Sequence, residues 1–202
     1  MFYPVLPDAD WIERLVPCGV QFVQLRLKDA GPDDIARQID RSLAVCAAHQ
    51  CVLVVNDYWR AAIKAGAPFV HLGQEDLVGA RLDVIKASGI GLGLSSHDGP
   101  ERRTALAADP HYIALGPVYE TKLKKMKWEP QGLERVSHWR RSMACPLVAI
   151  GGITLERADA VMEAGADMIA VVTDLVTSPE PEKRTADWVA WAERRQQSSQ
   201  GR

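Results

Sequence analysis

Eight short apolar runs alternate along the chain with longer amphipathic segments, and this alternation limits the possible folds more than any other feature. The runs are Phe2–Leu6, Val20–Leu25, Cys51–Val55, Phe69–Leu72, Ile90–Leu94, Tyr112–Leu115, Leu147–Ile150 and Met168–Val172. Strands separated by segments of helical length form βα units and a parallel sheet. Eight such units in 202 residues predict a compact single (β/α)8 TIM barrel over residues 1–195, near the lower length limit of that fold. A doubly wound open sheet is the alternative.

Helix start signals lie between these runs, where a proline or acidic residue occupies the first turn. The predicted helices include residues 32–49, 99–108, 154–165 and 180–195. The last of them carries Trp188 and Trp191, whose spacing of three indicates packing on the barrel wall. No linker rich in proline, glycine or serine divides the chain, and residues 196–202 are expected to form a disordered tail.

The composition excludes several classes of partner. The formal net charge is −2, whereas a nucleic-acid-binding domain is usually strongly basic, so nucleic acid is not expected. No run approaches the ~18 apolar residues of a membrane span, and the first residues lack the charged start of a signal peptide; we expect a cytoplasmic protein with no membrane partner. Cys18, Cys46, Cys51 and Cys145 have irregular spacing and apolar neighbours, which indicates reduced, buried thiols.

Polar residues follow most of the apolar runs at their carboxyl ends. In a parallel barrel all of these ends open onto one face, where the active sites of the fold lie. The cations there are Arg26, Lys28 and Lys124, the carboxylates are Asp57 and Asp76, the amides and hydroxyls are Gln24, Asn56, Gln74, Ser95, Thr121 and Thr173, and a glycine turn follows the seventh run at Gly151-Gly152. The sequence therefore predicts one site at this mouth.

Four lysines gather in the segment after the sixth run, at positions 122, 124, 125 and 127. A solvated charge run, a nucleic-acid patch and a pocket for a phosphorylated small molecule are the three interpretations. Cations and glycine turns before helix N-termini favour anions, and barrels often hold a phosphate after the seventh and eighth strands. Phosphorylated small molecules are therefore the expected substrates, although a tight βα turn alone would also explain Gly151-Gly152.

Asp57 and Asp76 are best interpreted as Mg²⁺ ligands, because Mg²⁺ takes one or two carboxylates together with water and phosphate oxygens. They suit acid/base catalysis less well, because the surrounding cations are expected to lower their pKa, and helix capping is the alternative role for each. His71 and His97 are either acid/base groups or structural residues. With no Ser/His/Asp order or Cys/His pair, the site is expected to hold a Mg²⁺-bound diphosphate and a second phosphate without a covalent nucleophile.

Seven segments then carry a resemblance to a known family. They are Gln24–Asp29, Val55–Asp57, Val70–Asp76, Gly93–Ser95, Gly116–Lys124, Ala149–Ile153 and Ala170–Thr173. In this order they resemble the thiamine phosphate synthase (thiamine-phosphate pyrophosphorylase) family, and the string Val-His-Leu-Gly-Gln-Glu-Asp is the most specific of them. The resemblance implies a barrel enzyme that joins 4-amino-2-methyl-5-hydroxymethylpyrimidine diphosphate to 4-methyl-5-(2-phosphoethyl)thiazole. The implied mechanism is dissociative, with diphosphate leaving before the thiazole nitrogen captures a pyrimidinylmethyl cation.

The resemblance also assigns roles residue by residue. It implies that the diphosphate binds Gln24, Arg26, Lys28 and Lys124, that Mg²⁺ binds Asp57 and Asp76, that Asn56 and Ser95 lie beside the pyrimidine, and that the thiazole phosphate binds Gly151, Gly152, Val172 and Thr173. The predicted catalytic set is Lys124, Arg26, Lys28 and Ser95. His71, Gln74 and Thr121 complete the predicted substrate-binding set.

Three positions depart from the family pattern and leave alternatives open. Leu123 replaces a threonine, Glu120 a common proline, and Tyr58 an arginine. A thiazole tautomerase of the same fold is one alternative, although the histidine expected after Gly116 in that group is Pro117 here. A non-catalytic barrel that binds a thiamine precursor is the other. The oligomeric state is open, and a homo-oligomer is compatible with the sequence.

Overall fold

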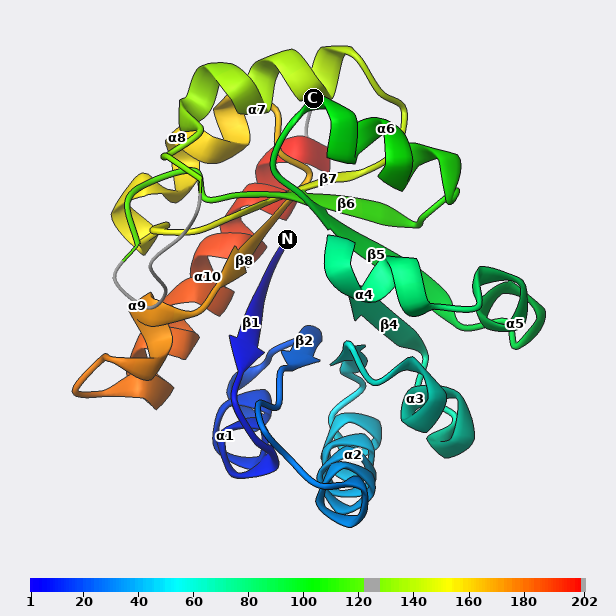
Figure 1. Ribbon diagram of the computed structural model, residues 1–202. Helices are drawn as coiled ribbons and strands as arrows, with labels where there is room; N and C mark the ends of the chain where they lie inside the picture. The colour runs from blue at the N-terminus through cyan, green and yellow to red at the C-terminus, as the bar shows by residue number, and fades with distance from the viewer. Residues whose placement is uncertain (122–127, 201–202) are drawn as a thin grey trace.

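The computed structural model describes residues 1–121 and 128–200, and its strands close into a barrel (Figure 1). The strands are β1 (Phe2–Leu6), β2 (Phe22–Leu25), β3 (Val52–Asn56), β4 (Phe69–Leu72), β5 (Gly91–Ser96), β6 (Tyr112–Leu115), β7 (Leu147–Ile150) and β8 (Met168–Val171). Each strand pairs in parallel with the next along the chain, and β8 pairs with β1. The predicted (β/α)8 TIM barrel is confirmed, and the open sheet is excluded.

Helices cover the outside of the barrel (Figure 1). They are α1 (Ala9–Leu15), α2 (Pro32–Ala48), α3 (Trp59–Ala65), α4 (Gln74–Gly79), α5 (Leu82–Ala87), α6 (Gly99–Ala107), α7 (Gly132–Arg141), α8 (Ala158–Glu163), α9 (Thr173–Val176) and α10 (Pro181–Gln200), with 3-10 turns η1 (Val16–Cys18) and η2 (Leu155–Arg157). The expected disordered tail is wrong for residues 196–200, which continue α10. Glutamate, arginine and glutamine favour a helix over residues 193–197, and Trp188 and Trp191 hold α10 against the core. Residues 201–202 lie outside the described part.

Two apolar cores fill the molecule. The outer one lies between strands and helices and includes Trp188 and Trp191, which confirms their packing role. The inner one fills the barrel with Tyr3, Val5, Tyr112, Ala114, Val148 and Ala170. β5 has glycines where these rings need room: a Cβ on Gly91 would lie 2.3 Å from the Phe69 ring, and one on Gly93 would lie 2.1 Å from the Tyr112 ring. The barrel is therefore a packed interior that leaves polar groups only toward its ends.

Two further expectations concern the whole chain. Within residues 1–121 and 128–200, no helix has the length and apolar character needed to cross a bilayer. All four cysteines are free, but only Cys46 and Cys51 are buried, while Cys18 and Cys145 are partly exposed. The expected burial of the thiols is therefore correct for two of them.

Candidate active site

The carboxyl ends of β3 and β4 form one side of the barrel mouth. Asn56 pairs with His71 across these strands, and the Asp57 N–H donates to the His71 carbonyl at 2.9 Å. Asp57 adopts a left-handed backbone conformation with φ of 64°, which aspartate tolerates better than most residues. The Asn56 side-chain amide donates to the Asp57 carboxylate at 2.5 Å. The turn after β3 thus holds the Asp57 carboxylate in a defined position.

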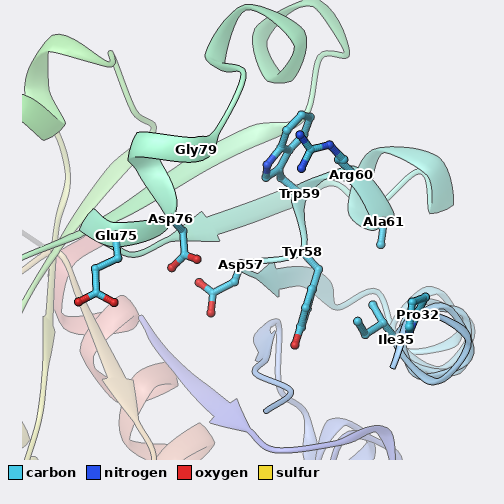
Figure 2. Close-up of a pocket in the computed structure, with 10 residues that line it drawn as sticks. All are labelled: Pro32, Ile35, Asp57, Tyr58, Trp59, Arg60, Ala61, Glu75, Asp76 and Gly79. Atoms are coloured by element: carbon cyan, nitrogen blue, oxygen red, sulfur yellow. The ribbon is translucent and has the colours of Figure 1, made fainter. Parts of the chain in front are cut away.

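Asp57 and Asp76 point toward each other, one from the end of β3 and the other from α4 (Figure 2). Their carboxyl groups lie within hydrogen-bonding reach. Burial and then the neighbouring Asp76 raise the pKa of Asp57 to about 6, against the opposing effects of Arg26 and the Gly73 N–H. The expected net lowering of the Asp57 pKa is therefore wrong: Arg26 does lower this pKa, but by less than burial and carboxylate repulsion together raise it.

This pair fits a hard divalent cation. Both groups are oxygen donors that repel each other when ionised, and a bound cation relieves that repulsion. Among the described residues, no group of three or more His, Cys, Asp or Glu side chains is arranged to hold a metal ion by itself, as a closed zinc site would require. Two carboxylates suit Mg²⁺, which keeps several waters and shares its remaining positions with substrate phosphates.

His71 is buried, 5% exposed, and both of its ring nitrogens are engaged. Nδ1 lies 3.0 Å from the Tyr112 hydroxyl and Nε2 lies 2.8 Å from the Ser95 hydroxyl. Burial and then Arg26 lower the pKa of His71 to about 4, so the ring is neutral at pH 7. Gln74 adds a second hold on the same residue, because its amide donates to the Ser95 carbonyl at 2.6 Å. His71 and Gln74 therefore both hold Ser95 in place.

Tyr112 and Tyr3 take part in this arrangement, although their positions in two apolar runs predicted only that they lie in strands. The Tyr112 hydroxyl interacts with Tyr3 and with Gln24 as well as with His71. Gln24 is 4% exposed, so its amide lies inside the barrel. The spacing of two between Tyr112 and Ala114 places both on one face of β6. A tyrosine that faces into the barrel needs a hydrogen-bond partner for its hydroxyl, so this spacing could have indicated a polar contact there.

The predicted cations differ in their exposure, and one of them lies outside the described residues. Arg26 is half-buried, and its backbone N–H donates to the Leu6 carbonyl at 2.8 Å. The charge of its side chain acts on both Asp57 and His71. Lys28 lies exposed two residues beyond. Lys124 lies outside the described residues, as do Lys122, Leu123, Lys125 and Lys127. Of the predicted cations that the structure describes, Arg26 is the one whose charge acts on Asp57.

The ends of β7 and β8 form the other side of the mouth. Gly151 and Gly152 have φ of 99° and 64°, and a Cβ on them would lie 2.6 Å from Pro117 Cα and 2.3 Å from the Glu120 carbonyl oxygen. Both positions therefore require glycine. Val172 and Thr173 follow β8, the strand paired with β7, and Thr121 follows Glu120, half-buried. The structure accounts for the tight turn and brings these predicted phosphate ligands to one side.

A hollow of about 490 Å³ extends outward from the carboxylate pair (Figure 2). Tyr58 and Glu75 line it, and the Arg60 guanidinium lies 4.1 Å from the centre of the Trp59 ring. Tyr58, the residue that departs from the family pattern, thus faces the space beside Asp57. The carboxylate pair and Arg26 lie at the carboxyl ends of the strands of a closed parallel barrel, the position typical of active sites in TIM-barrel enzymes.

Comparisons with known proteins narrow this class. A family model described as thiamine monophosphate synthase matches residues 5–175. The thiamine-phosphate synthase of Rhizobium etli is 57% identical over 190 residues, covering 94% of this chain and 93% of that protein. The protein of the same name from Salmonella typhimurium is 46% identical over 191 residues, covering 94% and 90%.

A solved structure has the same architecture. The thiamine phosphate pyrophosphorylase from Pyrococcus furiosus superposes with a TM-score of 0.82 over 92% of each chain, at 24% identity. This likeness concerns the fold. The chain belongs to the thiamine monophosphate synthase family, and it is an enzyme. The resemblance inferred from the seven segments is confirmed.

Proposed function

We propose that this chain is a Mg²⁺-dependent transferase that joins 4-amino-2-methyl-5-hydroxymethylpyrimidine diphosphate to 4-methyl-5-(2-phosphoethyl)thiazole, giving thiamine phosphate and diphosphate. The observation that carries the proposal is the facing pair Asp57 and Asp76, with Arg26 acting on it, at the mouth of the barrel. The names of the Rhizobium etli and Salmonella typhimurium relatives, thiamine-phosphate synthase, support the product.

The side of the mouth formed by β2–β5 binds the first substrate. Asp57 and Asp76 hold Mg²⁺, which when bound neutralises charge on the diphosphate. Arg26, Lys28 and Lys124 bind the diphosphate together with the Gln24 amide, and cations placed beside a leaving anion stabilise the charge that develops on it. Asn56 and Ser95 contact the pyrimidine. The hold of His71 and Gln74 on Ser95 supports a fixed orientation for that contact.

The reaction needs no proton transfer. The bond between the pyrimidinylmethyl carbon and the diphosphate oxygen breaks, and its electron pair leaves with the diphosphate. The lone pair of the thiazole nitrogen then forms the new carbon–nitrogen bond. The low pKa of His71, about 4, and the partners of both its ring nitrogens make it a poor base, which supports a mechanism without a general base.

The side of the mouth formed by β7 and β8 binds the second substrate. Gly151, Gly152, Val172 and Thr173 hold the thiazole phosphate, with Thr121 beside them. Backbone N–H groups in tight glycine turns form concave sites for anions. The left-handed conformations of both glycines support this assignment.

The test is a product assay with the purified chain. Both substrates and Mg²⁺ should give thiamine phosphate and diphosphate in equal amounts, and EDTA should stop the reaction. Isomerisation of a thiazole carboxylate phosphate without condensation would support the tautomerase instead. Binding of the pyrimidine diphosphate without turnover when the thiazole phosphate is supplied would support a non-catalytic barrel.

A further inference from the structure

Arg184, on α10, bridges the segments that follow β7 and β8. Its Nε donates to Asp174 Oδ2 at 2.9 Å and its Nη2 to Asp174 Oδ1 at 3.0 Å. The same Nη2 donates to the two oxygens of Glu156 at 2.9 and 3.0 Å. Asp174 directly follows Thr173, and Glu156 lies in η2, shortly after Gly152. One guanidinium therefore joins the two turns that line this side of the mouth.

The bridge is fixed to the core. The side chain of Arg184 is 22% exposed and that of Asp174 is 10% exposed, so water screens this pair less than a surface pair. Trp188 donates its indole N–H to Asp174 at 2.7 Å, and its ring stacks on Phe2 of β1. Two bonds from one guanidinium to one carboxylate set orientation as well as distance. Asp174 is thereby held in a defined place on the barrel.

The glycine turn also contacts the segment that follows β6. Arg157 donates to the Gly152 carbonyl at 2.7 Å, and the Tyr119 N–H donates to the Gly151 carbonyl at 3.0 Å. Arg157 also lies over the Tyr119 ring, 4.6 Å from its centre. These contacts hold the turn to the segment after β6. Arg184 links it to the segment after β8.

We propose that Arg184 is a positioning residue for the phosphate-bearing second substrate. A phosphate bound between Gly152 and Thr173 needs groups from both turns at a fixed separation, and small misplacements weaken such binding strongly. Arg184 acts by setting this separation through Asp174 and Glu156, without touching the substrate. The inference rests on the proposed function.

The experiment compares Arg184→Met with Arg14→Met as a matched control. Arg14, on α1, forms an ion pair at 2.7 Å with Glu182, which lies on α10 like Arg184. The expected result for Arg184→Met is a rise of roughly tenfold or more in the KM for the thiazole phosphate, with an unchanged KM for the pyrimidine diphosphate. The rise should disappear with the thiazole alcohol, which lacks the phosphate. Arg184→Lys should recover part of the loss, and Arg14→Met should behave as wild type.

A second variant covers the case in which Arg184→Met folds poorly. Glu156 is 69% exposed, so Glu156→Gln removes a charge on the η2 side at little risk to the fold and should raise the same KM by a smaller factor. Equal changes in both KM values, an effect that persists with the thiazole alcohol, or no effect in either variant would overturn the proposal. Calorimetric binding of inorganic phosphate, weakened in Arg184→Met, gives the same answer without turnover. An inactive wild-type chain that still shows this difference would contradict the proposed function alone.

Discussion

The substitution Asp57→Asn should stabilise the metal-free protein. The pKa of Asp57 is raised from 3.8 to about 6 by burial and by Asp76, so the ionised carboxylate lowers folding stability. A pKa difference of one corresponds to roughly 1.4 kcal/mol, which gives at most about 3 kcal/mol. Because the side chain is only half-buried, water screens part of the repulsion, and we expect about 1 kcal/mol. Asparagine also tolerates the left-handed φ of 64° at this position.

The stability difference between Asp57→Asn and wild type should depend on pH. A carboxyl group whose folded pKa lies above its unfolded value lowers stability only when it is ionised, so the cost develops between pH 4 and 6 and is complete above that range. In EDTA at pH 8, thermal unfolding of Asp57→Asn should occur about 2–4 °C above wild type. At pH 4 the two proteins should unfold together. With Mg²⁺ the order should reverse, because only wild type gains from binding the ion.

Asp109→Asn is the matched control, since Asp109 is also left-handed, with φ of 55°, but lies on an exposed turn where it pairs with Lys86. It should unfold within about 1 °C of wild type in every condition, as expected for an exposed ion pair. If Asp57→Asn were less stable than wild type in EDTA at pH 8, or gained as much at pH 4, the repulsion assigned to the carboxylate pair would be refuted.

Three further outcomes follow from the site. The buried His71 has a folded pKa of about 4, below its unfolded value, so its contribution to folding stability should fall by up to roughly 3 kcal/mol from pH 7 to pH 4. Because Asp57 acts in the opposite direction over this range, the measurement is the difference in urea unfolding between wild type and His71→Gln, which should shrink as the pH falls. Gly152→Ala would place a Cβ 2.3 Å from the Glu120 carbonyl oxygen. Calorimetry should therefore show a lower Tm, and kinetics should show a higher KM for the thiazole phosphate. A variant equal to wild type in both measurements would contradict the tight turn. Lys124→Ala should reduce kcat roughly 10²-fold with an unchanged Tm, while alanine at Lys122, Lys125 or Lys127 should have smaller effects; wild-type turnover in Lys124→Ala would remove its assigned role.

The strands could be predicted closely because each is a short apolar run with turn residues at its ends. Phe69–Leu72, Tyr112–Leu115 and Leu147–Ile150 match β4, β6 and β7 at both ends. β2 begins later than the run Val20–Leu25, because the Val20 N–H donates to the Val16 carbonyl at 3.3 Å in the turn that ends η1. A local hydrogen bond there competes with strand pairing, and apolar character alone does not reveal it.

The convergence of site residues followed from topology, but their chemistry did not. That Asp57, His71 and Ser95 share one face follows from parallel strands alone. The raised pKa of Asp57 depends on burial, which the chain acquires only on folding. The bridging role of Arg184 could not be predicted from its neighbours in the sequence either, because its partners Asp174 and Glu156 lie on other elements.

In the proposed function, Asp57 and Asp76 hold the Mg²⁺ that accompanies the diphosphate. Isothermal titration of Mg²⁺ into the protein with inorganic diphosphate tests it most directly, using wild type, Asp57→Asn, Asp76→Asn and the control Asp109→Asn. The binding heat should be the same in wild type and Asp109→Asn and should be lost in both site variants. Mg²⁺ binding of wild-type strength in Asp57→Asn or Asp76→Asn would contradict it.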